Sequence, residues 1–360
     1  MIEGHGDDLY RYGGKVKFNF STNILSGVNH EGLKKFLASR LDVIGSYPEP
    51  SPSLLEREIA MKEGVSRENV VVTNGATDAV YRLAFLGSGG RSAVLRPTFR
   101  EYQDACRLHG HDVSFFDSIG RLPSSPDMIW ICNPNNPTGQ VIPIDDIIGM
   151  CYAHKESLIV IDQAYSDYCP ERLITSEEAV ALGNTVLLRS LTKRYCVPGL
   201  RIGYAVTSAE IAGKLRNCSM PWVVNALAIE AARYLIGHDD DYPIDATGLR
   251  MEAERVASKL RAIGVEVYPT DCNFMLCRLP DGRSAELKNF LMDHHGLLIR
   301  DASNFEGLDA GCFRIAAQGR PADDILLEAI RQYLKGERRE KSRKIKKNQD
   351  QPRKIKINRD

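Results

Sequence analysis

The stretch Leu158-Ile159-Val160-Ile161-Asp162 is a short apolar run that ends on a carboxylate. Such a run, bounded by polar residues, is typical of a strand buried on both faces. Similar apolar runs lie at 70–73, 92–95, 128–132 and 186–188. Helical patterns alternate with these runs, as in Ala79 to Leu86, which follows the first of them. Strands that alternate with helices predict an α/β fold with a mostly parallel central sheet.

The pattern changes after about residue 240, where an amphipathic helix over 248–263 precedes a second set of strands. Strands are expected at 265–268, 273–277, 297–300 and 312–316, with a helix over 285–294. These elements predict a smaller α+β domain. We therefore predict an N-terminal arm with part of the small domain (1–45), a large domain (46–240), a small C-terminal domain (241–335) and a disordered basic tail (336–360).

The composition is that of an ordinary soluble protein of about two domains, with 360 residues, 43% hydrophobic and 26% charged. No apolar run is long enough to span a bilayer. The nine cysteines include no CxxC pair, which predicts reduced thiols in a cytoplasmic protein, with neither a disulfide framework nor a metal site.

The net charge of zero hides an asymmetry, because Lys and Arg dominate the chain from Lys335 onward. With almost no apolar residues, this tail is expected to be disordered. A solvated extension is the favoured interpretation, and nucleic-acid binding is the less favoured one.

A lysine follows the apolar run over 185–189, in Ser190-Leu191-Thr192-Lys193. Lys193 therefore lies where a strand ends, and there it can form a Schiff base with an aldehyde. Ser190 and Arg201 can supply hydrogen bonds and a fixed charge for a phosphate. Pyridoxal phosphate carries both an aldehyde and a phosphate. Alone, however, this lysine could equally be a solvated loop residue. The residues at the other strand ends are needed to distinguish the two interpretations.

Polar residues at three other strand ends suit the same cofactor. Gly75-Ala76-Thr77 opens a helix whose free N–H groups could bind phosphate, although a plain turn is the commoner use of such a motif. Asp162 is either a helix cap or the partner of a cation, and beside a pyridinium nitrogen it would keep the ring protonated. Tyr165 and Asn136 could bond the ring hydroxyl. Tyr102 could stack on the ring, or simply pack in the core.

These segments resemble the motif series of the fold-type-I pyridoxal-phosphate-dependent aminotransferase superfamily (class I/II), in its order and spacing. The motifs are Asn133 to Gly139, Asp162-x-x-Tyr165, Ser190-x-x-Lys193 and Arg201-x-Gly203-Tyr204, and the similarity covers roughly residues 5–334. The resemblance implies a large domain that binds pyridoxal 5'-phosphate. Gln163 departs from the pattern, since relatives commonly have glutamate there, with little expected effect on the pyridinium partner.

The resemblance also implies a role for each matching residue. Lys193 resembles the Schiff-base lysine, and Asp162 the partner of the pyridine nitrogen. Asn136 and Tyr165 match the ligands of the ring hydroxyl. The phosphate ligands are implied to be Ser190, Arg201 and the turn Gly75-Ala76-Thr77. Tyr47 looks like the tyrosine that reaches the phosphate of the neighbouring subunit, which implies a homodimer with shared active sites.

Within the superfamily, the likeness is closest to threonine-phosphate decarboxylases of cobalamin synthesis and to histidinol-phosphate aminotransferases. The segments Gly4–Asp7, Pro221–Ala228 and Leu298–Leu308 favour the decarboxylase branch. This implies decarboxylation of L-threonine O-3-phosphate to (R)-1-amino-2-propanol O-2-phosphate. The alternative is amino transfer with histidinol phosphate or a related phosphorylated amine.

The resemblance further implies which side chains would bind the substrate. Arg314 resembles the arginine that binds the α-carboxylate, which leaves Arg300 and the His5 arm for the substrate phosphate. Surface ion pairs are the alternative for both arginines. A regulator that binds pyridoxal phosphate without catalysis is disfavoured, because Lys193 is intact.

Overall fold

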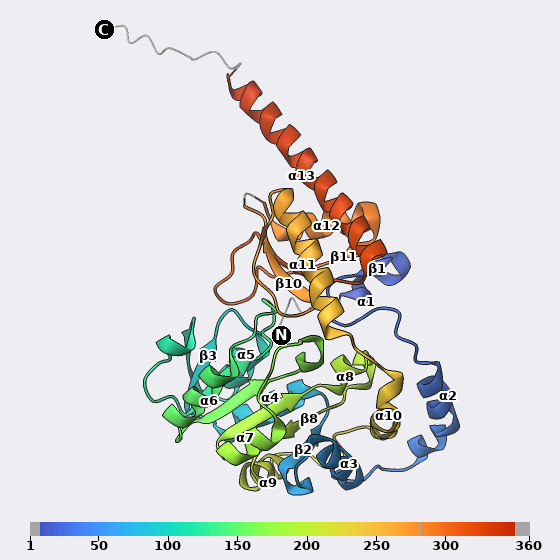
Figure 1. Ribbon diagram of the computed structural model, residues 1–360, viewed down its shortest axis with the longest axis vertical. Helices are drawn as coiled ribbons and strands as arrows, with labels where there is room; N and C mark the ends of the chain where they lie inside the picture. The colour runs from blue at the N-terminus through green and yellow to red at the C-terminus, as the bar shows by residue number, and fades with distance from the viewer. Residues whose placement is uncertain (1–7, 281, 350–360) are drawn as a thin grey trace.

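The computed structural model describes residues 8–280 and 282–349, with side chains through Gly336. Its main sheet lies in the lower part of the view in Figure 1. It has seven strands in the order β2-β8-β7-β6-β5-β3-β4. The bounds in that order are Val70–Thr73, Gly203–Val206, Thr185–Arg189, Leu158–Asp162, Met128–Cys132, Arg91–Leu95 and Asp112–Phe116. All neighbouring strands run parallel except β8, which is antiparallel to both β2 and β7. The predicted α/β fold with a mostly parallel sheet is confirmed, while β4 and β8 were not predicted.

Helices cover both faces of this sheet, so its strands are buried on both sides. Along β5, Ile129 and Ile131 face one core and Trp130 and Cys132 face the other. This explains why the strands are continuous apolar runs and do not alternate with polar residues. The helices of this part are α2 (Glu31–Ser39), α3 (Ser53–Glu63), α4 (Ala76–Leu86), α5 (Glu101–Leu108), α6 (Ile144–Ala153), α7 (Ser176–Leu182), α8 (Leu191–Arg194), α9 (Ala209–Asn217) and α10 (Ala226–Gly237).

The C-terminal part forms a separate four-stranded antiparallel sheet in the order β12-β13-β10-β9. Its bounds are Arg300–Asp301, Cys312–Ala316, Phe274–Arg278 and Glu266–Val267, and α11 (Ala246–Ala262) and α12 (Ser284–His295) pack on it. The strand expected over 297–300 is two strands. The second is β12, and the first, β11 (Leu297–Leu298), pairs in parallel with β1 (Phe18–Asn19) in a sheet of its own.

The N-terminal segment contributes to both parts of the molecule. It begins with α1 (Leu9–Tyr12). Phe20, just after β1, is fully buried in the core formed by α11, α12 and the C-terminal strands. Leu33 of α2 packs instead in the core of the main sheet. The predicted arm over residues 1–45 therefore divides its contacts, and the domain boundaries at 45, 240 and 335 remain predictions.

The last described helix, α13 (Arg320–Gln349), differs from the sequence prediction of a tail disordered from residue 336. Leu326, Leu327 and Ile330 anchor its start in the C-terminal core, and the helix then projects away from the body (Figure 1). Lys, Arg and Glu are good helix formers, and extending an existing helix needs no new nucleus. The prediction is thus wrong for 336–349, and 350–360 lie outside the described residues.

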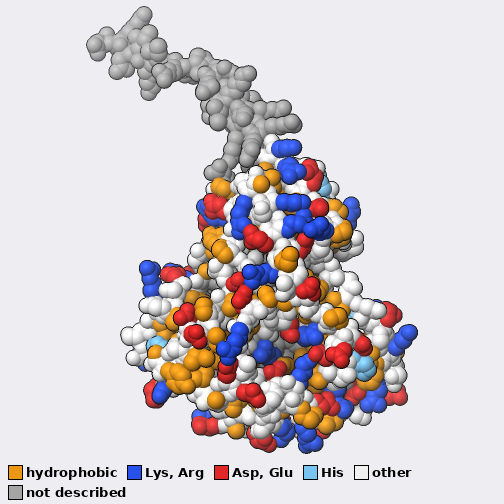
Figure 2. All heavy atoms as spheres, in the orientation of Figure 1, with side chains coloured by type: hydrophobic (Ala, Val, Ile, Leu, Met, Phe, Trp, Pro, Cys, Tyr) orange, Lys and Arg blue, Asp and Glu red, His pale blue; other side chains and the backbone are white. Residues whose placement is uncertain are grey.

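Charged side chains of both signs are interspersed over the face shown in Figure 2. None of the helices in the described chain is long and apolar enough to cross a membrane. All nine cysteines are free thiols.

Candidate active site

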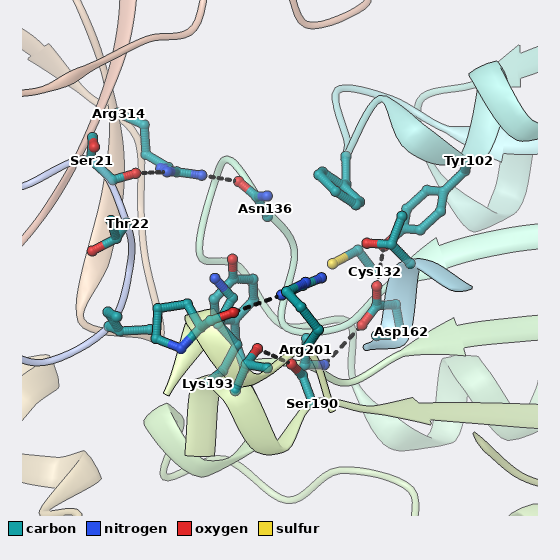
Figure 3. Close-up of a pocket in the computed structure, with 18 residues that line it drawn as sticks. Ser21, Thr22, Tyr102, Cys132, Asn136, Asp162, Ser190, Lys193, Arg201 and Arg314 are labelled. Atoms are coloured by element: carbon teal, nitrogen blue, oxygen red, sulfur yellow. Dashed lines mark hydrogen bonds between the residues drawn. The ribbon is translucent and has the colours of Figure 1, made fainter. Parts of the chain in front are cut away.

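The carboxyl ends of the parallel strands open into a cavity of about 250 Å³. Asp162 ends β6, Cys132 ends β5, and Ser190 follows β7, so the edge of the sheet forms one wall. Arg314 of β13 closes the opposite side (Figure 3). Ten of the predicted residues line this cavity: Ala76, Thr77, Tyr102, Asn136, Asp162, Tyr165, Ser190, Lys193, Arg201 and Arg314.

Lys193 lies on the one-turn helix α8, directly after the main sheet's strand β7. Its Nζ lies 5.7 Å from the centroid of the Tyr165 ring. The Tyr168 hydroxyl donates a hydrogen bond to the Lys193 carbonyl oxygen at 2.9 Å. The lysine amine and the Tyr165 phenol thus face the same space, and burial raises the pKa of Tyr165 to about 12. Tyr165 is therefore a neutral hydroxyl that can donate or accept a hydrogen bond.

Asp162 is buried at the inner end of the cavity. It accepts hydrogen bonds from the Tyr102 hydroxyl at 2.7 Å and from the backbone N–H of Ala164 at 2.9 Å. Burial raises the pKa of this carboxyl, while the Tyr102 and Ala164 hydrogen bonds and the charge of Lys193 lower it. A cationic ring nitrogen beside Asp162 would favour the ionised form further. The carboxyl therefore has the environment expected of a partner for a pyridinium.

Tyr102 also lines the cavity, and its ring stacks on Trp130 with centroids 5.7 Å apart. Its side chain is only 1% exposed. The predicted stacking of this ring on the cofactor remains a prediction, and the structure adds a second contact, the hydrogen bond to Asp162.

Gly75, Arg201 and Ser190 lie together at the predicted phosphate end. Gly75 has φ +82° and caps α4, and a Cβ built on it would lie 2.7 Å from Nη2 of Arg201. The guanidinium therefore packs against the glycine at the N-terminus of the helix. Arg201 itself has φ +54° and donates to the carbonyl of Pro198 at 3.1 Å. A cation, a hydroxyl and a helix N-terminus form a donor set that fits a phosphate dianion.

Arg314 is buried and extends from β13 toward the large domain. It donates hydrogen bonds to the Asn136 side-chain oxygen and to the carbonyl oxygen of Ser21. Burial lowers the pKa of Arg314 to about 10. Arg314 and Asn136, predicted as ligands of different groups, are thus in direct contact (Figure 3).

Arg300 does not line the cavity but lies beside Arg314, because the two residues are register partners on β12 and β13. Arg300 donates to the Asp301 carbonyl oxygen and, at 2.8 Å, to the Asn304 side chain. Its guanidinium lies over the Phe305 ring, 5.2 Å from the centroid. Burial lowers its pKa to about 10. A surface ion pair, the alternative weighed from the sequence, is thus excluded for this buried residue.

Two other predicted residues lie away from the cavity or outside the described chain. Tyr47 is 83% exposed, and its ring packs on Trp222 with centroids 5.0 Å apart. Its side chain therefore faces the surface. His5 lies outside the described residues.

Several residues of the cavity wall were not predicted. Ser21, Thr22 and Ile24 come from the N-terminal segment, and Phe99, Cys132, Thr192 and Pro198 come from the ends of the main-sheet strands or the segments that follow them. Cys132 could have been found, because it ends an apolar strand as Asp162 does. The N-terminal residues gave no such signal, since the pairing of β1 with β11 places them there.

Comparison with known proteins identifies the family. The family model for aminotransferase class I and II matches residues 15–330, so the chain belongs to this family. Enzymes of this family depend on pyridoxal 5'-phosphate, and the donor set described above fits that cofactor. Lys193, Asp162, Ser190 and Arg201 are the residues of this chain that would hold it.

Particular members of the family resemble this chain over most of its length. The crystal structure of L-threonine-O-3-phosphate decarboxylase from Porphyromonas gingivalis has a TM-score of 0.85 and 35% identity, covering 88% of this chain and 99% of that one. Threonine-phosphate decarboxylase of Salmonella typhimurium is 29% identical, over 88% of this chain and 91% of the relative. Histidinol-phosphate aminotransferase of Caldanaerobacter subterraneus is 28% identical, over 81% and 85%.

Proposed function

We propose that this protein decarboxylates L-threonine O-3-phosphate to (R)-1-amino-2-propanol O-2-phosphate with pyridoxal 5'-phosphate as cofactor, a step of cobalamin synthesis. The similarity to two threonine-phosphate decarboxylases supports the reaction. The observation that carries the proposal is a pair of buried arginines, Arg314 in the cavity wall and Arg300 beside it, because the pair matches the charges of this substrate.

Arg300 and Arg314 stand opposite each other on neighbouring strands, and each has neutral hydrogen-bond partners. Burial is the main cause of the lowered pKa of Arg314, and the positive charge of Arg300 lowers it further. Anions bound between them would relieve this repulsion. Threonine phosphate carries a carboxylate and a phosphate, one anion for each guanidinium, whereas histidinol phosphate carries only the phosphate. The pair therefore favours the phosphorylated amino acid.

Bound pyridoxal phosphate supplies an electron sink that stabilises negative charge on the substrate α-carbon. Lys193 would hold the cofactor aldehyde, and Asp162 would keep the ring nitrogen protonated. Arg314 would bind the α-carboxylate and thereby set its angle to the ring. By fixing the orientation of the α-carboxylate, Arg314 would determine which bond to the α-carbon is weakened.

The second candidate is an aminotransferase that acts on histidinol phosphate, which the similarity to the Caldanaerobacter relative favours. Lys193 serves both reactions, because it could also remove the α-hydrogen. The orientation of the substrate separates the two outcomes, and Arg314 would set it for threonine phosphate, which has an α-carboxylate, but not for histidinol phosphate, which has none.

The experiment supplies the holoenzyme with threonine phosphate and measures carbon dioxide and the amine product. A parallel reaction offers histidinol phosphate with 2-oxoglutarate and measures glutamate. We expect gas release in the first reaction and little transfer in the second. Fast transfer without gas release would overturn the proposal in favour of the aminotransferase.

Lys193→Ala tests the lysine assignment itself. This variant should lose both turnover and the visible absorbance of the cofactor joined to the protein. Retention of that absorbance would mean that another residue holds the aldehyde. Arg57, an exposed residue of α3 away from the cavity, offers a control in Arg57→Ala, which should keep both properties.

We further propose a cytoplasmic homodimer in which Tyr47 reaches the phosphate site of the second subunit. The exposure of Tyr47 and the free state of all nine cysteines support this arrangement. Sedimentation equilibrium should give twice the chain mass of 40.1 kDa. Tyr47→Phe should weaken cofactor binding without changing that mass.

A further inference from the structure

The helical turn that carries Lys193 is too short to hold itself in place. Helix α8 has four residues, Leu191–Arg194, and a single turn gains too few hydrogen bonds to be stable alone. Tertiary contacts must therefore set the position of Lys193. The next residue, Arg194, faces a second, smaller cavity behind the active site and does not line the first.

Arg194 uses all three guanidinium nitrogens on different partners. Its Nε lies 3.2 Å from Oδ1 of Asp167, and its Nη2 lies 3.0 Å from Oδ1 of Asp239. Its Nη1 donates to the Tyr242 carbonyl oxygen at 2.6 Å. The side chain is only 15% exposed, so these contacts are largely shielded from solvent screening.

Asp239 extends the network to the neighbouring helix. It accepts a hydrogen bond from the Tyr195 hydroxyl at 2.6 Å and lies 2.8 Å from Nζ of Lys62, on α3. The side chain of Tyr195, the residue after Arg194, is 1% exposed. Both residues that follow Lys193 are therefore anchored to the same carboxylate.

Asp167 connects Arg194 to the segment that carries Tyr165. Asp167 lies two residues after Tyr165, in the short 3-10 helix Ser166–Tyr168. From the same turn, the Tyr168 hydroxyl donates to the Lys193 carbonyl oxygen at 2.9 Å. Two contacts thus join the turn after Tyr165 to the turn of Lys193.

We propose that Arg194, through Asp167 and Asp239, is a positioning residue that fixes the amine of Lys193 relative to the phenol of Tyr165. The inference rests on the proposed role of Lys193 and deepens it. Both groups must meet the same cofactor, one at its aldehyde and one at its ring hydroxyl. A displacement of about 1 Å between such groups can cost about a hundredfold in rate.

The test uses the holoenzyme carrying Arg194→Met, which keeps the side-chain length and removes the guanidinium. Arg194→Lys restores the charge without the three directed contacts. The matched control is Arg216→Met, because Arg216 also combines a carboxylate, Glu56, with backbone carbonyls, at 24% exposure, but lies away from the cavity.

The first measurement is an absorbance titration of the bound cofactor against pH without substrate, which reports the environment of the Lys193 nitrogen. We expect Arg194→Met to shift the midpoint by about half a unit or more. The second is steady-state kinetics, where kcat should fall between about tenfold and a hundredfold with little change in KM. Arg194→Lys should recover part of both effects, and Arg216→Met should show neither.

A purely structural role of Arg194 predicts a different result. Arg194→Met and Arg216→Met would then lower thermal stability equally, and both would keep the wild-type titration midpoint and kcat. That result would overturn the inference. Should Arg194→Met fail to fold, Asp167→Ala removes the oxygen that accepts from Arg194 Nε and leaves the Asp239 and Tyr242 contacts. A wild-type titration midpoint in that variant would overturn the inference equally. If the wild-type protein itself bound no pyridoxal phosphate, the proposed function would fail instead.

Discussion

Replacement of Gly75 by alanine tests the phosphate end of the site most directly. Gly75 has φ +82° and ψ 160°, a region that essentially only glycine occupies. A Cβ at this position would also lie 2.7 Å from Nη2 of Arg201. The substitution therefore adds backbone strain and pushes against the guanidinium assigned to the phosphate.

The two effects have different magnitudes and different readouts. Holding alanine in this conformation costs about 1–3 kcal/mol, which should appear as a loss of stability in the apoprotein. If Arg201 moves aside, the phosphate loses a charge-assisted hydrogen bond of about 1.5–3 kcal/mol. That loss corresponds to a rise in the cofactor Kd of between about tenfold and a hundredfold.

The assay combines chemical denaturation of the apoprotein with titration of pyridoxal phosphate by absorbance. Gly149→Ala is the matched control, because Gly149 lies inside α6 with open space around its Cβ position. This control should stabilise the protein by about 0.5–1 kcal/mol and leave cofactor binding unchanged. Wild-type affinity in Gly75→Ala would refute the assignment of this turn to the phosphate.

Three further predictions concern the rest of the site and the C-terminal helix. Arg314→Ala should raise the KM for the substrate between about tenfold and a hundredfold, because it removes a charged contact to the carboxylate, and an unchanged KM in steady-state kinetics would contradict its assignment. Because burial raises the folded-state pKa of Asp162, its contribution to apoprotein stability should be lost as pH rises through that pKa, and Asp162→Asn should flatten this part of a denaturation series across pH. Deletion of residues 336–360 should leave turnover and the free energy of unfolding unchanged, since the anchoring residues of α13 precede them, and a fall in the denaturation midpoint would contradict this.

Much of the main sheet could be predicted because most of its strands are apolar runs that can be recognised from the local sequence. The runs at 70–73, 128–132 and 158–162 match β2, β5 and β6. Burial on both faces requires every residue to be apolar, and this is visible without any knowledge of neighbours. Strand β4, Asp112–Phe116, was missed because its exposed and intermediate residues break the apolar run at the edge of the sheet.

The C-terminal part was harder to predict where strands are short. The run over 297–300 reads as one strand, but its two halves pair with different partners, β1 and β13. Only the pairing of β12 with β13 shows that Arg300 and Arg314 are register partners. The N-terminal residues Ser21 and Thr22 reach the cavity by the same long-range pairing, which no local pattern encodes.

The sequence by itself predicted the chemistry of the cofactor site. Ser190 and Lys193 follow one apolar strand and Asp162 ends another. Parallel strands bring their carboxyl ends to one edge of the sheet, so position along the chain implies position in space. The tertiary structure alone decided the contacts between distant segments: Tyr102 with Asp162, Arg314 with Asn136, and Arg194 with Asp167 and Asp239. Packing and charge determine these contacts between long side chains only when the chain folds, so the spacing of residues in the sequence does not predict them.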